Sequence, residues 1–246
     1  MVSKESDKIV LGFSTGCLHK SGLSEVERLN FLRSIGCRVV ELGCVKLKDF
    51  FSGELMSLKA NDLRGFDYVS FHAPVSDYGF NECTREIFRG IRNLNRARTL
   101  DLVVFHPDTV YDFAAFYMKS VDFNFAFENM DKRKASHKSV KDMAKLAFQF
   151  QYPLDNFKMV LDVNYAYTND PTMTLAAEFY EKLGDKIAQV HLSGYAGRHE
   201  PLFQTRQSEI IKSIRNLNVP IIVESILQPE ELVLERDYIL EVLREV

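Results

Sequence analysis

Short apolar runs alternate along the chain with segments in which apolar residues recur at helical spacing. Residues 9–14 form the first run, and it ends at the turn residues that follow it. The segment after it opens with a capping box from Ser24 to Glu27 and keeps a helical period until Gly36. A short apolar run bounded by polar and turn residues is typical of a buried strand. The pattern therefore predicts a strand followed by a helix.

The same strand and helix unit recurs along the whole chain. The predicted strands are residues 9–14, 38–43, 68–72, 102–106, 123–128, 157–162, 187–191 and 220–224. The predicted helices are residues 24–35, 49–58, 84–99, 111–118, 140–150, 171–183, 208–217 and 229–246. This alternation, with no linker or break in composition, predicts one α/β domain, a (β/α)8 TIM barrel over residues 1–246 with a polar tail at residues 1–8. An open doubly wound sheet is the alternative, but no Gly-rich phosphate turn follows the first strand.

Length and composition are those of a soluble globular protein. Of the 246 residues, 46% are hydrophobic and 26% are charged, which is enough for a sizeable core. The net charge of -3 disfavours a protein that coats nucleic acid, although it does not exclude nucleic acid as a partner.

The sequence gives no sign of targeting to a membrane or to an oxidising compartment. Residues 1–8 are too charged for a signal peptide, and no apolar run approaches the ~20 residues of a membrane span. The cysteines lack any paired spacing, which favours reduced thiols over a disulfide framework. These features predict a cytoplasmic protein without a membrane partner.

A His, Asp or Glu ends each predicted strand from the third to the eighth. These residues are His72, His106, Glu128, Asp162, His191 and Glu224. In a barrel of this kind the carboxyl ends of the strands converge on one mouth, so the six side chains would share one space. Nitrogen and oxygen donors suit a divalent ion such as Zn or Mn, and a cation would offset the repulsion between three buried carboxylates. The sequence thus predicts a site for one or two divalent ions.

Structural roles are the alternative for each of these residues taken singly. A lone His at a strand end is more often a hydrogen-bonded rim residue than a ligand, and Asp162 could cap the turn at Asn164. His72 and His106, each followed closely by proline, could shape their loops.

A basic stretch, residues 132–138, follows the fifth strand and falls on the same side of the barrel as the strand ends. It is either a solvated loop or a clamp for a phosphate or carboxylate group, in which Lys132 and Arg133 would act with Arg198 and His199. The second interpretation allows a small-molecule substrate to be anionic.

The strand ends carry a resemblance to a known family. The set Glu128, Asp162, His191 and Glu224 resembles the metal-binding quartet of the xylose isomerase-like TIM-barrel superfamily. That superfamily includes sugar isomerases and epimerases and the endonuclease IV type of AP endonuclease (AP endonuclease family 2). The resemblance covers nearly the whole chain, and its most specific parts are residues 71–74, 105–107, 128–129, 191–193 and 198–202.

The resemblance implies two chemistries. In the isomerase and epimerase branch, the quartet holds one ion, and Glu128 and Glu224 would also form the acid/base pair for proton transfer on a small sugar, polyol or sugar phosphate. In the endonuclease IV branch, His72, His106 and Glu128 would bind one ion, and Glu128 would bridge to a second. That arrangement implies a two-metal phosphoesterase or endonuclease.

The chain departs from the endonuclease branch at its third metal. Tyr165 stands where that branch has a His three residues after the strand-six Asp, and Gly197 stands where it has an Asp before His199. Many epimerases use a His at the position of Tyr165 to bind substrate, so Tyr165 is a candidate substrate-binding residue. We therefore predict a metal-dependent sugar isomerase or epimerase, with a two-metal hydrolase and a metal-binding barrel without turnover as alternatives. The substrate, the metal and the oligomeric state are left open.

Overall fold

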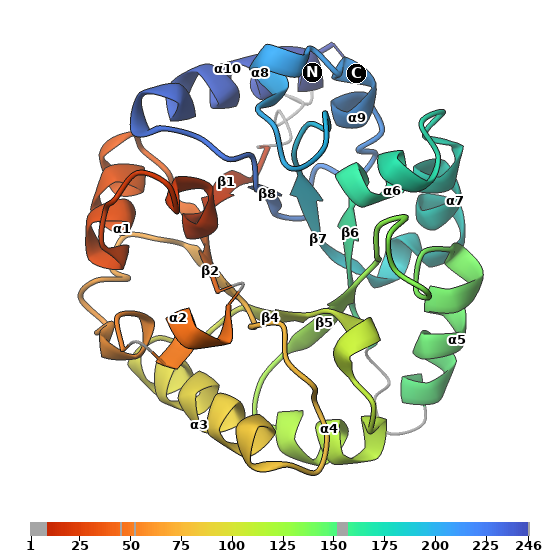
Figure 1. Cartoon of the computed structure of the whole chain (residues 1–246). Coiled ribbons are helices and arrows are strands. Elements are labelled where there is room, and N and C mark those ends of the chain that lie inside the picture. Colours follow the sequence, from red (N-terminus) through yellow and green to blue (C-terminus); the bar gives the residue numbers. More distant parts are fainter. Residues whose placement is uncertain (1–8, 45, 52, 152–156, 246) are drawn as a thin grey trace, which may run out of the picture.

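Eight parallel strands close into a barrel in sequence order in the computed structural model of the chain (Figure 1). The structure describes residues 9–44, 46–51, 53–151 and 157–245. The strands are β1 (Leu11–Ser14), β2 (Val39–Gly43), β3 (Tyr68–His72), β4 (Leu102–Phe105), β5 (Phe125–Glu128), β6 (Met159–Asp162), β7 (Ile187–Leu192) and β8 (Ile221–Val223). The barrel closes where β1 pairs in parallel with β8, with Leu11 opposite Ile221. The predicted (β/α)8 barrel is confirmed, and each strand lies inside its predicted run or extends one residue beyond it.

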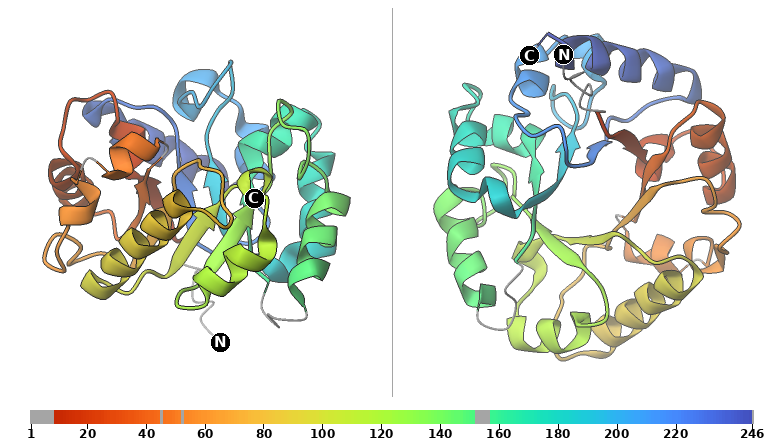
Figure 2. Two further views of the ribbon diagram at one scale, coloured as in Figure 1. Left: turned by 60° about the horizontal axis from the view of Figure 1, so that its bottom comes forward. Right: turned by 180° about the vertical axis from the view of Figure 1, so that it is seen from behind.

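Helices form a ring outside the strands, which Figure 2 shows from the side and from behind. They are α1 (Glu25–Ser34), α2 (Leu47–Phe51), α3 (Glu82–Ala97), α4 (Phe113–Ser120), α5 (Val140–Gln151), α6 (Val163–Asn169), α7 (Thr174–Leu183), α8 (Leu202–Thr205), α9 (Ser208–Lys212) and α10 (Leu232–Leu243). The capping box predicted for α1 is present, because Ser24 and Glu27 each accept a hydrogen bond from the other's backbone N–H. Within the ranges that the structure describes, no helix has both the length and the apolar character to cross a membrane.

Some helix boundaries differ from the predicted ones. α2 ends at Phe51, and Gly53 follows it with a φ of 96°, a left-handed conformation that favours glycine. α9 ends at Lys212, and further on the side chain of Asn216 accepts a hydrogen bond from Asn218 N at 3.0 Å, a turn contact that competes with helix. α6 and α8 lie outside the predicted helices, and α6 begins directly at the end of β6 with no loop between them.

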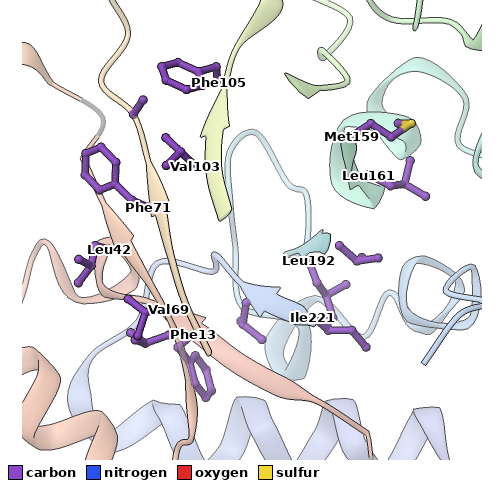
Figure 3. Packing of buried hydrophobic residues seen from close by; sticks show 14 of the residues in the cluster. Phe13, Leu42, Val69, Phe71, Val103, Phe105, Met159, Leu161, Leu192 and Ile221 are labelled. Atoms are coloured by element: carbon purple, nitrogen blue, oxygen red, sulfur yellow. The ribbon is translucent and has the colours of Figure 1, made fainter. Parts of the chain in front are cut away.

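Strand residues alternate between two apolar clusters, one on each side of the barrel wall. Val103 and Phe105 of β4 belong to a large cluster between the strands and the helices, part of which Figure 3 shows. Leu102 and Val104 alternate with these two residues along β4, and they belong to a small separate cluster with inward residues of neighbouring strands. Because successive side chains of a strand point to opposite faces, this small cluster lies inside the barrel. Its buried members are Leu102, Val104, Ala126 and Val160.

Aromatic packing fixes α3 and α4 against the wall of the barrel. The rings of Phe105 on β4 and Phe116 on α4 lie 4.8 Å apart at 87°, and Phe88 on α3 lies 5.5 Å from Phe116 at 85°. Edge-to-face contacts of this kind add about 0.5–1.5 kcal/mol each to the burial of the rings. They hold in place the strands from which the polar mouth residues extend.

Candidate metal centre

Six polar side chains at or next to the last residues of β3 to β8 share the inward side of the barrel wall. Glu128, for example, lies two residues beyond Ala126, which belongs to the inner cluster. Because the side-chain period of a strand is two, both point into the barrel. The structure brings all six strand-end residues into three overlapping groups that could hold an ion. They are His72, His106, Glu128, Asp162, His191 and Glu224.

Four of these residues form one group, named the quartet: Glu128, Asp162, His191 and Glu224. One ligand atom from each lies within 4.8 Å of those of the others. His191 Nδ1 lies 2.5 Å from Glu128 Oε1 and 3.6 Å from Glu224 Oε2. His191 is 0% exposed, and Glu128 and Asp162 are 1% exposed, so these charges are shielded from water. The arrangement supplies nitrogen and oxygen donors to one point.

Glu128 also faces a second group, formed with His72 and His106. Its Oε2 atom lies 3.0 Å from His106 Nε2 and 3.6 Å from His72 Nε2. The two oxygens of Glu128 are thus turned toward different sets of imidazole nitrogens. A carboxylate in this position is able to bridge two ions.

Asp162 is held by its neighbours so that one carboxylate oxygen is left over. Its backbone N–H donates to Asn129 Oδ1 at 2.8 Å, and Asn129 Nδ2 donates to its carbonyl at 3.0 Å, which ties the ends of β5 and β6 together. Asp162 Oδ1 caps α6 by accepting from Tyr165 N at 2.9 Å. Oδ2 is buried without a hydrogen-bond partner among the described residues. The capping interpretation and the ligand interpretation of Asp162 are therefore compatible.

The electrostatics of the quartet fit a divalent cation. Burial, and then the charges of Glu128 and Glu224, raise the pKa of Asp162 well above its usual value. Glu128 Oε2, like Asp162 Oδ2, is a buried oxygen that accepts no well-directed hydrogen bond within the described ranges, although His106 Nε2 and His72 Nε2 lie 3.0 and 3.6 Å from it. A bound cation would relieve the repulsion between these carboxylates and coordinate the unpartnered oxygens. The residues present thus fit a divalent cation.

When no cation is bound, protonated histidines offset part of the repulsion between the buried carboxylates. Burial disfavours the charged imidazole, but Glu224, Glu41 and Glu128 together raise the pKa of His191 well above its usual value. For His72, burial again lowers the pKa, and the nearby Glu128 carboxylate, with Oε2 3.6 Å from Nε2, outweighs it, so that the pKa rises from 6.5 to about 9. Metal binding must displace such protons.

The metal-free protein is therefore expected to lose stability as the pH rises from about 6.5 to about 9. The folded-state pKa of His72 lies above its unfolded value, so its contribution is complete below 6.5 and is lost as the pH passes about 9. At about 1.4 kcal/mol per pKa unit, the loss is at most about 3.5 kcal/mol. Urea unfolding of chelator-treated protein at several pH values measures it. A His72→Asn variant should show a flatter profile, and an unchanged profile in that variant would contradict this assignment.

Glu41 is a buried carboxylate of the site that the sequence analysis missed. It lies within β2, is 0% exposed, and its Oε2 atom is 3.1 Å from His191 Nε2. The sequence did contain a signal. Glu41 is the one charged residue of the run Val39–Gly43, and it lies two residues before the strand end Gly43, so both face the same side of the strand. It escapes the pattern of polar strand ends because it does not itself end the strand.

A cavity of about 220 Å³ opens above the metal centre. Drug-sized ligands occupy about 300–1,000 Å³, so this cavity suits a smaller molecule. His72, His106 and Glu224 line it, and each belongs to a candidate ion-binding group that also contains the buried Glu128. The residues around it are Ser14, Gly16, Cys17, His19, Gly43, His72, His106, Tyr165, His199, Glu224 and Ile226.

A second, smaller cavity brings together the residues predicted to bind substrate. Lys132, Arg133, Tyr165, Arg198 and His199 all line it, and Tyr165 and His199 line the larger cavity as well. Their charges are compensated to different degrees. Arg133 is paired with Asp131, while Lys132 Nζ lies 5.2 Å from the centre of the Tyr195 ring. The side chains of Lys132 and Arg198 form no ion pair with a carboxylate within the part of the chain that the structure describes, although the backbone N–H of Arg198 donates to both carboxylate oxygens of Glu200 at 3.1 and 3.0 Å.

His199 connects the small cavity to the metal centre. Its Nδ1 atom lies 2.9 Å from Ser193 Oγ and 3.9 Å from Glu224 Oε2, and its ring centre is 5.8 Å from that of Tyr165. Gly197, by contrast, lies in the exposed loop with a φ of 137° and offers no side chain to a metal.

No protein-family model matches the chain, and a search of curated protein sequences found no match. Solved structures do match. A D-tagatose 3-epimerase-like protein is 19% identical with a TM-score of 0.66, and the match covers 96% of this chain and 98% of that chain. An L-ribulose 3-epimerase is 16% identical with a TM-score of 0.62, over 96% and 94% of the two chains. A probable 3-DHS dehydratase of petrobactin synthesis from Bacillus anthracis is 14% identical with a TM-score of 0.62, over 92% and 96%.

These structures share the architecture of the chain over nearly its whole length. The chain therefore has the same closed, parallel eight-stranded barrel fold as these proteins. At 14–19% identity the likeness concerns the fold, and the function must be argued from the site.

Proposed function

We propose that this protein is a divalent-metal-dependent isomerase or epimerase that acts by proton transfer on a small sugar, polyol or sugar phosphate. The observation that carries the proposal is the quartet, in which two glutamates and a buried His and Asp converge beneath a cavity of sugar size. The similar structures support the same class of reaction, since they include a D-tagatose 3-epimerase-like protein and an L-ribulose 3-epimerase.

The two glutamates of the quartet are the proposed acid/base pair. The ion, when bound, would polarise neighbouring oxygens of the sugar and so acidify the adjacent C–H group. Glu224 lines the cavity and has direct access to a bound sugar, so it is placed to exchange a proton with the substrate carbon. Glu128 is the proposed partner on the opposite side of the transfer, and its position is set by contacts with His191 and His106.

Tyr165 and His199 are the proposed contacts to the sugar itself. Both line the cavity above Glu224, and each presents a polar atom on an aromatic ring. Tyr165 cannot easily ionise there, since burial, and then Glu128 and Asp162, raise its pKa well above the usual value. It would therefore act as a neutral hydroxyl that hydrogen-bonds to the substrate.

Lys132 and Arg198 are the proposed clamp for an anionic substituent, supported by Arg133. Replacing either Lys132 or Arg198 by Ala is expected to raise KM for a sugar phosphate about 10-fold, because a hydrogen bond to a charged group contributes about 1.5–3 kcal/mol. KM for the neutral sugar should be unchanged, and so should kcat. Steady-state kinetics with both substrates makes the comparison. Equal effects on the two KM values would contradict the clamp.

Solvent deuterium exchange tests the proposed chemistry directly. Wild-type protein loaded with Zn²⁺ or Mn²⁺ is incubated in D₂O with a panel of ketoses and their phosphates, and deuterium at the carbon next to the carbonyl is measured by NMR. Incorporation in at least one substrate, lost on chelation, is expected. Tight binding of a sugar with no exchange would instead indicate a metal-binding barrel without turnover.

A two-metal phosphoesterase or endonuclease is the second candidate. The observation that favours it is the second group, in which Glu128 Oε2 faces His72 and His106. Metal analysis separates the candidates, because one ion per chain is expected for the proposed isomerase and two for the hydrolase. Nicking of abasic-site DNA that is lost in His106→Ala would rank the hydrolase above the isomerase.

A further inference from the structure

Glu41 is a buried charge that the proposed proton transfer does not use. It lies inside the barrel below the mouth, opposite Ser70 of β3 in the strand register. Inward positions of such barrels are normally filled by branched apolar side chains, and a buried carboxylate is costly unless it is fully hydrogen-bonded. The presence of Glu41 at 0% exposure therefore needs a reason.

A network of side chains fixes the orientation of the Glu41 carboxylate. Its Oε2 atom accepts hydrogen bonds from Ser70 Oγ at 3.1 Å and Gln189 Nε2 at 2.8 Å. Gln189 is itself oriented from below, because Tyr68 Oη donates to its Oε1 at 3.0 Å. The amide of Gln189 thus turns its NH₂ group toward Glu41.

Glu41 Oε2 also lies close to Nε2 of His191, the ring nitrogen that faces away from Glu128. His191 Nε2 is 3.1 Å from Glu41 Oε2, while Nδ1 faces Glu128 on the other side of the ring. Gln189 Nε2 also lies 2.7 Å from His191 Nε2, but an amide nitrogen can only donate: one of its two N–H groups serves Glu41, and the other can serve Nε2 only while that nitrogen carries no proton. Glu41 is therefore the acceptor available to a proton on Nε2 among the described residues.

A histidine binds a metal through one nitrogen, and the hydrogen bond at the other nitrogen selects the tautomer and fixes the ring. We propose that Glu41 is a positioning residue that accepts the Nε2 proton of His191, so that Nδ1 presents its lone pair to the ion of the quartet. The inference rests on the proposed metal centre. It predicts that Glu41, a residue of β2, increases the affinity of that centre for its ion.

The test is the affinity of purified protein for Zn²⁺ and Co²⁺, measured by competition with a chelator at fixed pH. Glu41→Gln keeps the size of the side chain and removes its charge, and we expect the dissociation constant to rise about 10–100-fold with the number of ions per chain unchanged. The visible absorption of bound Co²⁺ should shift as well, since it reports the coordination of the ion and not the stability of the fold.

Glu25→Gln is the matched control. Glu25 is another buried carboxylate, 4% exposed, but it contacts Arg28 and no residue of the quartet. This variant should bind both ions as the wild type does. Wild-type affinity and an unchanged Co²⁺ spectrum in Glu41→Gln would overturn the proposal. A wild type that binds no divalent ion would instead refute the metal centre itself.

Glu41→Asp keeps the test decisive if the Gln variant does not fold. It retains the charge but withdraws the carboxylate by one methylene from His191, so weaker metal binding is again expected. Full affinity in Glu41→Asp would show that buried charge, and not contact with Nε2, sets the affinity, and the positioning role would then be wrong.

Discussion

Replacing Glu128 by Gln is expected to abolish turnover, with a loss of about 10⁴-fold in kcat. The amide keeps the shape of the side chain but cannot act as a base, and general acid/base groups contribute about 10²–10⁴-fold on their own. Gln is also a poorer metal ligand than a carboxylate, which adds to the loss. Deuterium exchange into the substrate, followed by NMR, gives the rate.

The physical reason for so large an effect is that Glu128 contacts every imidazole of the centre. Its two oxygens lie within 2.5–3.6 Å of His191, His106 and His72. Glu25→Gln again serves as the control for removal of a buried carboxylate, and circular dichroism checks the fold of both variants. A Glu128→Gln variant that retained a tenth of the wild-type rate would remove Glu128 from the proposed acid/base pair.

Removing the metal is expected to lower the melting temperature by about 8–16 °C at neutral pH. An ion present at about 1,000 times its dissociation constant contributes about 4.1 kcal/mol to the folded state. For a chain of this size, 1 kcal/mol corresponds to about 2–4 °C. Thermal unfolding followed by circular dichroism, with a chelator and then with added Zn²⁺ or Mn²⁺, measures the shift.

The size of this shift should depend on pH in a defined direction. Burial opposes the charged imidazoles, but neighbouring carboxylates raise the pKa values of His191 and His72, so protons compete with the ion at low pH. The shift on metal removal should therefore grow as the pH rises toward about 9. An Asp162→Asn variant should show a reduced shift. A melting temperature indifferent to both chelator and metal would argue against a metal centre.

The hydrophobic pattern was sufficient to predict the barrel and the positions of its strands. A buried parallel strand has a short apolar sequence with polar ends, which is a local property, and β3 was predicted to the residue. Helix ends were predicted less well, as at α2 and α9, because turn contacts and glycines override helical spacing there. α6 was missed since Asp162 ends a strand and caps a helix at once.

The sequence by itself determined which side chains end the strands, and the geometry of parallel strands in a closed barrel then requires that they meet. Their distances were decided only by the tertiary structure. The two faces of Glu128 are one example, because its partners His72, His106 and His191 come from three other strands.

Glu41 is the second example. It lies 150 positions before His191 in the chain, and the two meet only because β2 and β7 face each other across the closed barrel. No local pattern encodes such a contact, since it depends on the stagger of the strands and on which inward side chains reach across the interior. The chemistry of the site could thus be read from residue types, while the order of its hydrogen bonds required the fold.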